Sequence, residues 1–451
     1  MAVNMMHPTG SRIGSGFFTI GKALALALCL TLGCSTTHAQ QLAISNDDKE
    51  FTEMIGKLYT ASNEELLEAL QQETDDKKLL RYYKENYKYI FASINKQIQN
   101  GSVFNIPVVV SALKQTLANI GNQHPDAPKG LQVLLLRSDM PNALTVGDKF
   151  VYVNIGLYAH MDNDAQIAAV LCHEVAHLML RHTMQVFQYH YKKNQDQKEA
   201  AKQLREVSTG RSDRAFELVR GYLYQGLKLS RTHELEADSA GYILYRKLGY
   251  PPAEYTRMLA MLEKFEDAKP DGLKTESYKR FFHLPQQPFN DKWLQGEDFS
   301  AYNYNAYKPR LDKDSVESHP KSKERTAYIN KLFPETADAK TATPTAAFTN
   351  MKTLAQNHWL PNLYINEYYG LFVYYLLVQL QASPDNKQYK EWLGKGFEKI
   401  YEARKAYQLN KYVDVIAPKD QTKSYMEFLN FIWNLKPEEL EKIKNYYNAK
   451  G

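Results

Sequence analysis

Ten residues in the first half of the chain, CHEVAHLMLR at Cys172–Arg181, carry side chains that could bind a metal ion. His173 and His177 are four residues apart, which places them about 40° apart on one face of an α-helix. Two imidazoles so placed can bind a single zinc ion. Glu174 beside them can take a proton from zinc-bound water and pass it to a leaving amine. Because such a string also arises by chance, the surrounding elements must support it.

A helix is predicted around these residues. Asn163 is a candidate N-cap, and Gln166 follows three residues later in the capping-box position. Apolar residues recur at helical spacing beyond this cap and predict a helix that continues at least to His182. On such a continuous helix His182 lies half a turn from His173, so it is interpreted as a surface residue or one that supports the site from outside. Cys172 is expected to be a buried core thiol.

A catalytic zinc site needs a third protein ligand and one open position. The stretch LSRTHELEADSAG at Leu229–Gly241 supplies a candidate, Glu234, 57 residues after the second histidine. Arg231 and Asp238 share a helical face with it. Asp238 can orient a zinc-binding histidine, and Arg231 can brace a carboxylate or a substrate carbonyl. A solvated acidic helix is the alternative, although small residues such as Gly241 on this face suit packing against a second helix.

The two stretches together resemble the gluzincin family of the CAAX prenyl proteases, the OMA-type proteases and the periplasmic chaperone-proteases. That family pairs HExxH with a downstream ExxAD, and the similarity extends over about Leu131–Leu332. It includes Ser318–Pro320 (SHP) followed by Arg325, which is similar to a late HP…R element of the family. The resemblance implies an active-site or regulatory role for His319 and Arg325, since this histidine can hold some periplasmic members latent. The alternative for His319 is a helix-capping or loop histidine.

The resemblance also implies roles for the residues of the two helices. One zinc ion per chain would be bound by His173, His177 and Glu234. Glu174 would be the general base, and Asp238 would lie behind the ligands. The family branch implied is the soluble, exported one, because no membrane-spanning segment is expected in the mature chain.

The N-terminus has the pattern of an export signal. Two basic residues precede a ten-residue apolar run at Ala23–Leu32, and Thr37–Ala39 resembles a signal-peptidase site. Residues 1–39 are therefore expected to be a signal peptide, and the protein is expected in the periplasm or cell envelope of a bacterium. The alternative is a lipoprotein site at Cys34, which would give a lipid-anchored form.

Composition excludes some classes of partner. The formal net charge of +5 is too balanced to favour nucleic acid or an anionic membrane surface as a partner. No apolar run of 18 or more residues follows the leader, so no transmembrane span is expected in the mature chain.

Four regions are predicted after the leader. They are an N-terminal helical region (40–130), a zinc metallopeptidase core (131–340), a small-residue linker (341–349) and a helical C-terminal extension (350–451). Within the core, the long polar connection 266–315 is interpreted as a lid or a mobile segment.

The core is expected to have a zincin-like fold of the α+β class, mostly α. Leu131–Leu136 and Lys149–Asn154 have the composition of strands and predict a small antiparallel sheet just before the metal-binding helix. An exposed edge of this sheet could bind a peptide as one more strand, or the sheet could serve only to support the helix.

These observations predict a zinc metalloendopeptidase of the cell envelope that hydrolyses peptide bonds of misfolded or misassembled proteins. The alternative is an envelope chaperone or assembly factor with a latent zinc site. In both hypotheses the C-terminal helices are candidate partner-binding elements.

Overall fold

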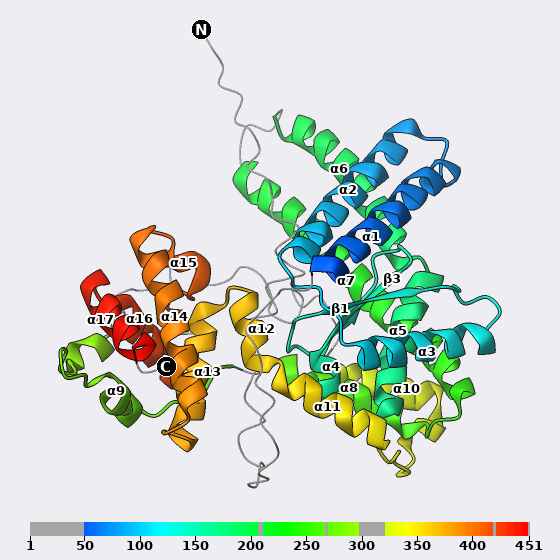
Figure 1. Ribbon diagram of the computed structural model, residues 1–451. Coiled ribbons are helices and arrows are strands. Elements are labelled where there is room, and N and C mark those ends of the chain that lie inside the picture. The colour runs from blue at the N-terminus through cyan, green and yellow to red at the C-terminus, as the bar shows by residue number, and fades with distance from the viewer. Residues whose placement is uncertain (1–48, 206–210, 267–268, 297–320, 418–420, 450–451) are drawn as a thin grey trace. The chain divides into compact units, whose positions relative to one another are not determined.

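The computed structural model describes residues 49–205, 211–266, 269–296, 321–417 and 421–449, with side chains described except at 197–227 and 266 (Figure 1). The predicted leader and His319 lie outside these residues. The chain forms two compact units. The larger unit contains Ala39–Lys264 and Gly296–Tyr368, and the smaller unit contains Phe265–Gln295 and Tyr369–Gly451, each as far as it is described.

The larger unit is built on a three-stranded sheet of order β1–β3–β2, with β1 at Gln132–Leu136, β2 at Ala143–Leu144 and β3 at Phe150–Asn154. The two longer strands lie where the sequence predicts them. The sheet is mixed, however, and the expectation of an antiparallel sheet is wrong: β1 and β3 are parallel, whereas β2 and β3 are antiparallel. After β1 the chain forms β2 at the opposite edge of the sheet, and it then returns as β3 between these two strands. Strand β3 is therefore antiparallel to β2 and parallel to β1.

Both faces of this sheet are covered by helices, and alternate residues of β1 and β3 enter two separate cores. On one face lie α3 (Pro107–Gln123) and α5 (Asp164–Met179); on the other lie α1 (Lys49–Ala69) and α2 (Lys77–Gln99) (Figure 1). The strand residues facing the first core are Val133, Leu135, Val151 and Val153, and those facing the second are Leu134, Leu136, Phe150 and Tyr152.

Helix α5 begins as predicted and ends earlier than predicted. The Asn163 side chain accepts a hydrogen bond from Gln166 N at 3.0 Å and caps its N-terminus. The helix ends at Met179, and Arg181 adopts a left-handed conformation with φ 57°. The predicted continuation through His182 is therefore wrong, since the chain turns there and starts α6 (His182–Arg205).

Helix α7 (Arg211–Tyr245) packs against α5, and both carry residues of the site. The close approach depends on Gly241, where a Cβ would lie 2.9 Å from His173 Cα and 3.1 Å from His173 N. Ala237, one turn earlier, is fully buried in the same contact region. The small residues on this face therefore serve helix packing, as the sequence indicated. Helix α10 (Ser322–Leu332) also packs on α7.

The predicted linker leads directly into a helix of the larger unit. Helix α11 begins at Ala346, and Phe348 is buried with its ring 5.8 Å from that of Tyr158. The remaining helices of this unit are α4 (Gly156–His160), α8 (Ala253–Glu266), α11 (Ala346–Asn357) and α12 (Trp359–Ile365), with short 3-10 turns at Leu70–Gln72, Arg246–Leu248 and Pro334–Ala337.

The smaller unit consists of helices joined by short connections in its described residues, with one isolated β-bridge between Leu284 and Gln287. Its elements are α9 (Thr275–Phe282), η4 (Asp291–Leu294), α13 (Tyr369–Ala382), α14 (Lys387–Lys405), α15 (Leu409–Tyr412), α16 (Lys423–Asn434) and α17 (Pro437–Asn448). The rings of Phe282 and Trp293 lie 4.6 Å and 6.2 Å from that of Phe431. Residues 269–295 are thus a packed part of this unit, so their interpretation as a mobile connection is wrong, whereas their interpretation as a lid stays a prediction.

Across the described residues, no helix has both the length and the apolar character needed to cross a membrane.

Candidate active site

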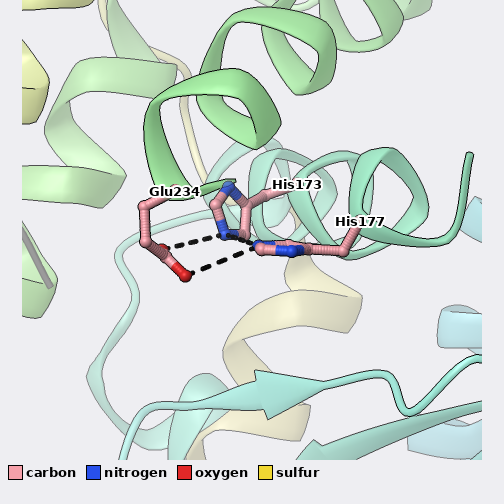
Figure 2. Close-up of side chains that lie close together, drawn as sticks. All are labelled: His173, His177 and Glu234. Carbon is pink, nitrogen blue, oxygen red and sulfur yellow. Dashed lines mark hydrogen bonds and ion pairs between the residues drawn. The ribbon is translucent and has the colours of Figure 1, made fainter. Parts of the chain in front are cut away.

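Three side chains from two helices converge at the contact between α5 and α7 (Figure 2). His173 Nε2 and His177 Nε2, one turn apart on α5, lie 3.0 Å from each other. The Glu234 carboxylate approaches from α7, with Oε2 3.5 Å from His173 Nε2 and Oε1 3.6 Å from His177 Nε2. All three side chains are largely buried, so the donor atoms form a compact triangle shielded from solvent.

The dimensions of this triangle fit a tetrahedral metal ion. Metal–ligand bonds of about 2.1 Å, typical of zinc, require ligand atoms about 3.4 Å apart at the corners of a tetrahedron. The three measured separations lie close to that value. If these three side chains held the ion, they would leave one corner of the tetrahedron for water or substrate, as in catalytic rather than structural zinc sites.

The charges of the site also favour a cation. Burial lowers the pKa of His177 to about 3, so its imidazole is neutral and has a lone pair to donate. Burial lowers the pKa of His173 as well, but Asp238 and Glu234 outweigh it and raise that pKa to about 10. Glu234 thus stabilises positive charge where the two Nε2 atoms meet, and Asp238 does so from the Nδ1 side of the His173 ring.

Asp238 and Arg325 support the ligands from behind. Asp238 Oδ1 lies 3.1 Å from His173 Nδ1, which directs the opposite nitrogen, Nε2, toward the site. Arg325 on α10 donates two hydrogen bonds to this carboxylate, from Nε at 2.8 Å and from a terminal nitrogen at 2.7 Å. Another guanidinium nitrogen lies 3.3 Å from Glu234 Oε2. One buried arginine thus contacts both Glu234 and Asp238, the carboxylate that lies beside His173.

Glu174 lies beside the triangle with its carboxylate almost fully buried. Burial raises the pKa of Glu174 to about 7, and the negative charge of Glu234 adds to this effect. A carboxyl group with such a pKa can both accept and donate a proton near neutral pH. Thr145, just after β2, has its hydroxyl 3.4 Å from Glu174 Oε2 and from the Glu174 carbonyl oxygen, so the end of this strand borders the site.

The remaining predicted residues have different positions. Arg231 is partly exposed on α7, and its bracing role stays a prediction. His319 lies outside the described residues, so the structure does not describe its position. His182, by contrast, reaches the site, because the turn at Arg181 brings its Nδ1 to 2.8 Å from His177 Nδ1.

Two contacts of the site could not be read from spacing. Thr145 is separated from Glu174 by 29 residues, and Arg325 from Asp238 by 87. No local pattern in the sequence links these pairs, although the late HP…R resemblance did single out Arg325.

A helix carrying HExxH, packed against a second helix that provides a glutamate and set beside a small sheet, defines a metallopeptidase of the zincin type. Residues 110–332 match the family model of peptidase family M48. The chain therefore belongs to this zinc-dependent gluzincin family, and the matched segment runs from within α3 to the end of α10. Among curated proteins, no significant match was found.

Proposed function

We propose that this metallopeptidase is a zinc endopeptidase of the bacterial cell envelope that cleaves misfolded or misassembled proteins. The observation that carries the proposal is the triangle of His173 Nε2, His177 Nε2 and the Glu234 carboxylate, with Glu174 beside it. When bound there, zinc would act as a Lewis acid that polarises a peptide carbonyl and acidifies a coordinated water.

The remaining steps, proton transfer and positioning of the ligands, are assigned to side chains of the protein. Glu174 takes the proton of the attacking water and delivers it to the leaving amine. A carboxyl group does both most effectively when its pKa lies near the working pH. Asp238 and Arg325 hold His173 and Glu234 in place, so that the site does not need to rearrange during the reaction. The contacts of Asp238 and Arg325 with His173 and Glu234 support the holding role, and the raised pKa of the buried Glu174 supports its role as the base.

The edge of the sheet supports an endopeptidase that binds extended chains. Among the described residues, β2 is an edge strand of the sheet. Asn142 O accepts from Asn154 N of β3 at 2.9 Å, so the neighbouring residue, Ala143, directs its N–H and C=O away from β3. A peptide pairing with that edge would pass Thr145 and Glu174 in an extended conformation. Only an unfolded or loosely folded segment can adopt it, which favours misfolded substrates.

Glu174→Gln tests the chemistry. The purified mature chain is given an unfolded substrate, and cleavage is followed by mass spectrometry of the products. Loss of the base is expected to lower kcat by about 100-fold or more while zinc content stays at one per chain. Glu324→Gln, at an exposed carboxylate on α10, is the matched control and should cleave as wild type does. Equal cleavage by Glu174→Gln and wild type would refute the mechanism, whereas no cleavage by wild type would favour the chaperone alternative.

The products also test the mode of cleavage. Internal fragments are expected from an endopeptidase, whereas release of single residues or dipeptides from one end would contradict that assignment.

The cellular location rests on the N-terminal sequence and has its own test. Mass spectrometry of the protein isolated from its native cells should show Gln40 as the first residue. An acylated Cys34 at the N-terminus would instead identify a lipid-anchored form, and an intact Met1 in a cytosolic fraction would contradict export.

A further inference from the structure

The surroundings of His182 differ from those of an ordinary surface histidine. Its side chain is buried, with 4% of the residue exposed, although it begins a polar helix. It reaches this position through Arg181, whose left-handed backbone costs a non-glycine residue about 1 kcal/mol. The turn places His182 Nδ1 2.8 Å from Nδ1 of the metal ligand His177, on the side opposite to the metal triangle.

The positions of the protons in this contact follow from the metal site. His177 directs Nε2 toward His173 and Glu234, so a metal ion takes the lone pair of that nitrogen. A neutral imidazole then carries its proton on Nδ1 and donates it to His182 Nδ1. His182 must accept at Nδ1, so its own proton resides on Nε2, which lies 3.2 Å from Glu236 Oε2. Each of the two hydrogen bonds, from His177 to His182 and from His182 to Glu236, therefore has one donor and one acceptor.

His233 holds the ring of His182 from its face. The two imidazoles are stacked, with centroids 4.1 Å apart and planes at 11°. His233 Nε2 lies 3.1 Å from Gln185 Oε1, an amide oxygen that can only accept, so His233 is itself oriented. The stacking leaves the His182 ring little freedom to rotate away from His177.

His182, His233 and Glu236 also have the composition of a second metal site, with donor atoms within 4.8 Å of one another. The proton order argues against its use while the first site is filled, because His182 Nε2 then carries a proton. The stacked rings argue against it too, because a metal ion must lie near the plane of each imidazole that binds it. The cluster is better suited to support His177 than to hold an ion of its own.

We infer that His182 is a positioning residue for the zinc ligand His177, and that Glu236 and His233 keep it in the accepting tautomer. The inference rests on the proposed zinc site and adds to it a hydrogen-bond chain from Glu236 through His182 to the metal ligand. Outer partners of metal-binding histidines typically change metal affinity by about 10- to 100-fold.

Substitution of His182 by asparagine or by glutamine, whose side chains differ by one methylene group, distinguishes hydrogen bonding to His177 from mere packing. Asparagine places its carbonyl oxygen near the position of a histidine Nδ1, whereas glutamine places its polar group near that of Nε2. We expect His182→Asn to bind zinc within a few-fold of wild type, while His182→Gln and His182→Ala bind it about 10- to 100-fold more weakly. Glu236→Gln keeps an acceptor for His182 and should lose less affinity than Glu236→Ala.

The measurement is the zinc dissociation constant of the full chain, by competition with a chelator, together with the unfolding midpoint of the metal-free protein. Equal affinity of His182→Gln and wild type, or a loss of affinity matched by an equal loss of metal-free stability, would overturn the inference. So would a second zinc ion in wild type that is lost in His233→Ala. If wild type binds no zinc, the proposed function fails first and this inference with it.

Discussion

At the scale of single residues, the buried charges of the site depend on one arginine. Arg325 is 7% exposed and contacts two carboxylates, those of Asp238 and Glu234. Burying charges in this way is tolerable only while each has a partner, because desolvation of an unpaired carboxylate is expensive. The arginine therefore supports folding and metal binding together.

Arg325→Ala should destabilise the protein by about 3 kcal/mol, because it removes the guanidinium beside the buried Asp238 carboxylate and leaves this carboxylate only its contact with His173. Arg325→Lys should recover only part of this loss, since an ammonium group cannot make the two parallel hydrogen bonds of the guanidinium. Denaturant unfolding of the metal-free protein provides the measurement. Lys323→Ala, at an exposed position of the same helix, is the control, and a loss at Arg325 no larger than at Lys323 would contradict the assignment.

A second buried acid should make stability depend on pH. Asp148 accepts hydrogen bonds from Phe150 N and from the Tyr152 hydroxyl, and burial raises the pKa of Asp148 from 3.8 to about 6. Between these values the folded state keeps a proton that the unfolded chain releases, so this group makes stability fall as pH rises.

Asp148→Asn removes that titration. The difference in free energy of unfolding between Asp148→Asn and wild type should move in favour of the variant by about 2 kcal/mol from pH 4 to pH 7. Urea unfolding at the two pH values measures it. Asp126→Asn, at an exposed aspartate, should show no such trend, and parallel curves for Asp148→Asn and wild type would exclude the effect.

At the scale of elements, the site depends on the distance between α5 and α7. Gly241 sets that distance, because a Cβ there would meet backbone atoms of His173, which cannot move aside as the end of a flexible side chain can. Glu234 stands two turns earlier on α7, so a shift of this helix moves one ligand relative to the other two.

Gly241→Ala should therefore weaken zinc binding by 10-fold or more and lower stability by about 1–3 kcal/mol through overpacking. Its control is Ser239→Ala, whose hydroxyl bonds only carbonyl groups of its own helix, and which should change stability by less than about 0.5 kcal/mol. Chelator competition and denaturant unfolding give the two readouts. Unchanged values for Gly241→Ala would show that the helices can separate at no cost.

The elements also show what sequence patterns can and cannot predict. The capped start of α5 and the strands β1 and β3 were predictable, because each depends on the nearest few residues. The parallel pairing of β1 with β3 was not predictable, because it depends on the position of β2, which lies between them in the sequence but pairs at the other side of β3. The end of α5 was missed because Arg181 takes a backbone conformation that glycine or asparagine would have signalled.

At the scale of the whole molecule, the boundary between the two units does not follow the order of the chain. Residues 265–295 precede α10, which belongs to the larger unit, yet they form one unit with 369–451. Within that unit, Leu273 N donates to the Tyr374 hydroxyl at 3.4 Å, and the Tyr447 hydroxyl donates to Phe281 O at 2.6 Å. A segment inserted in the peptidase sequence is thus held by contacts to the C-terminal helices.

Truncation after Tyr368 should expose this segment rather than remove a separate domain. Phe282 and Trp293 would lose their ring contacts with Phe431, and α9 alone is too short to be stable as a helix. Limited proteolysis is expected to cut the truncated chain within 269–295, at sites protected in the full chain. Zinc affinity should change little, because the triangle and its supports lie in the larger unit. Equal protection of 269–295 in both chains would show that this segment folds without the C-terminal helices, and any phenotype of the truncation could then be assigned to those helices alone.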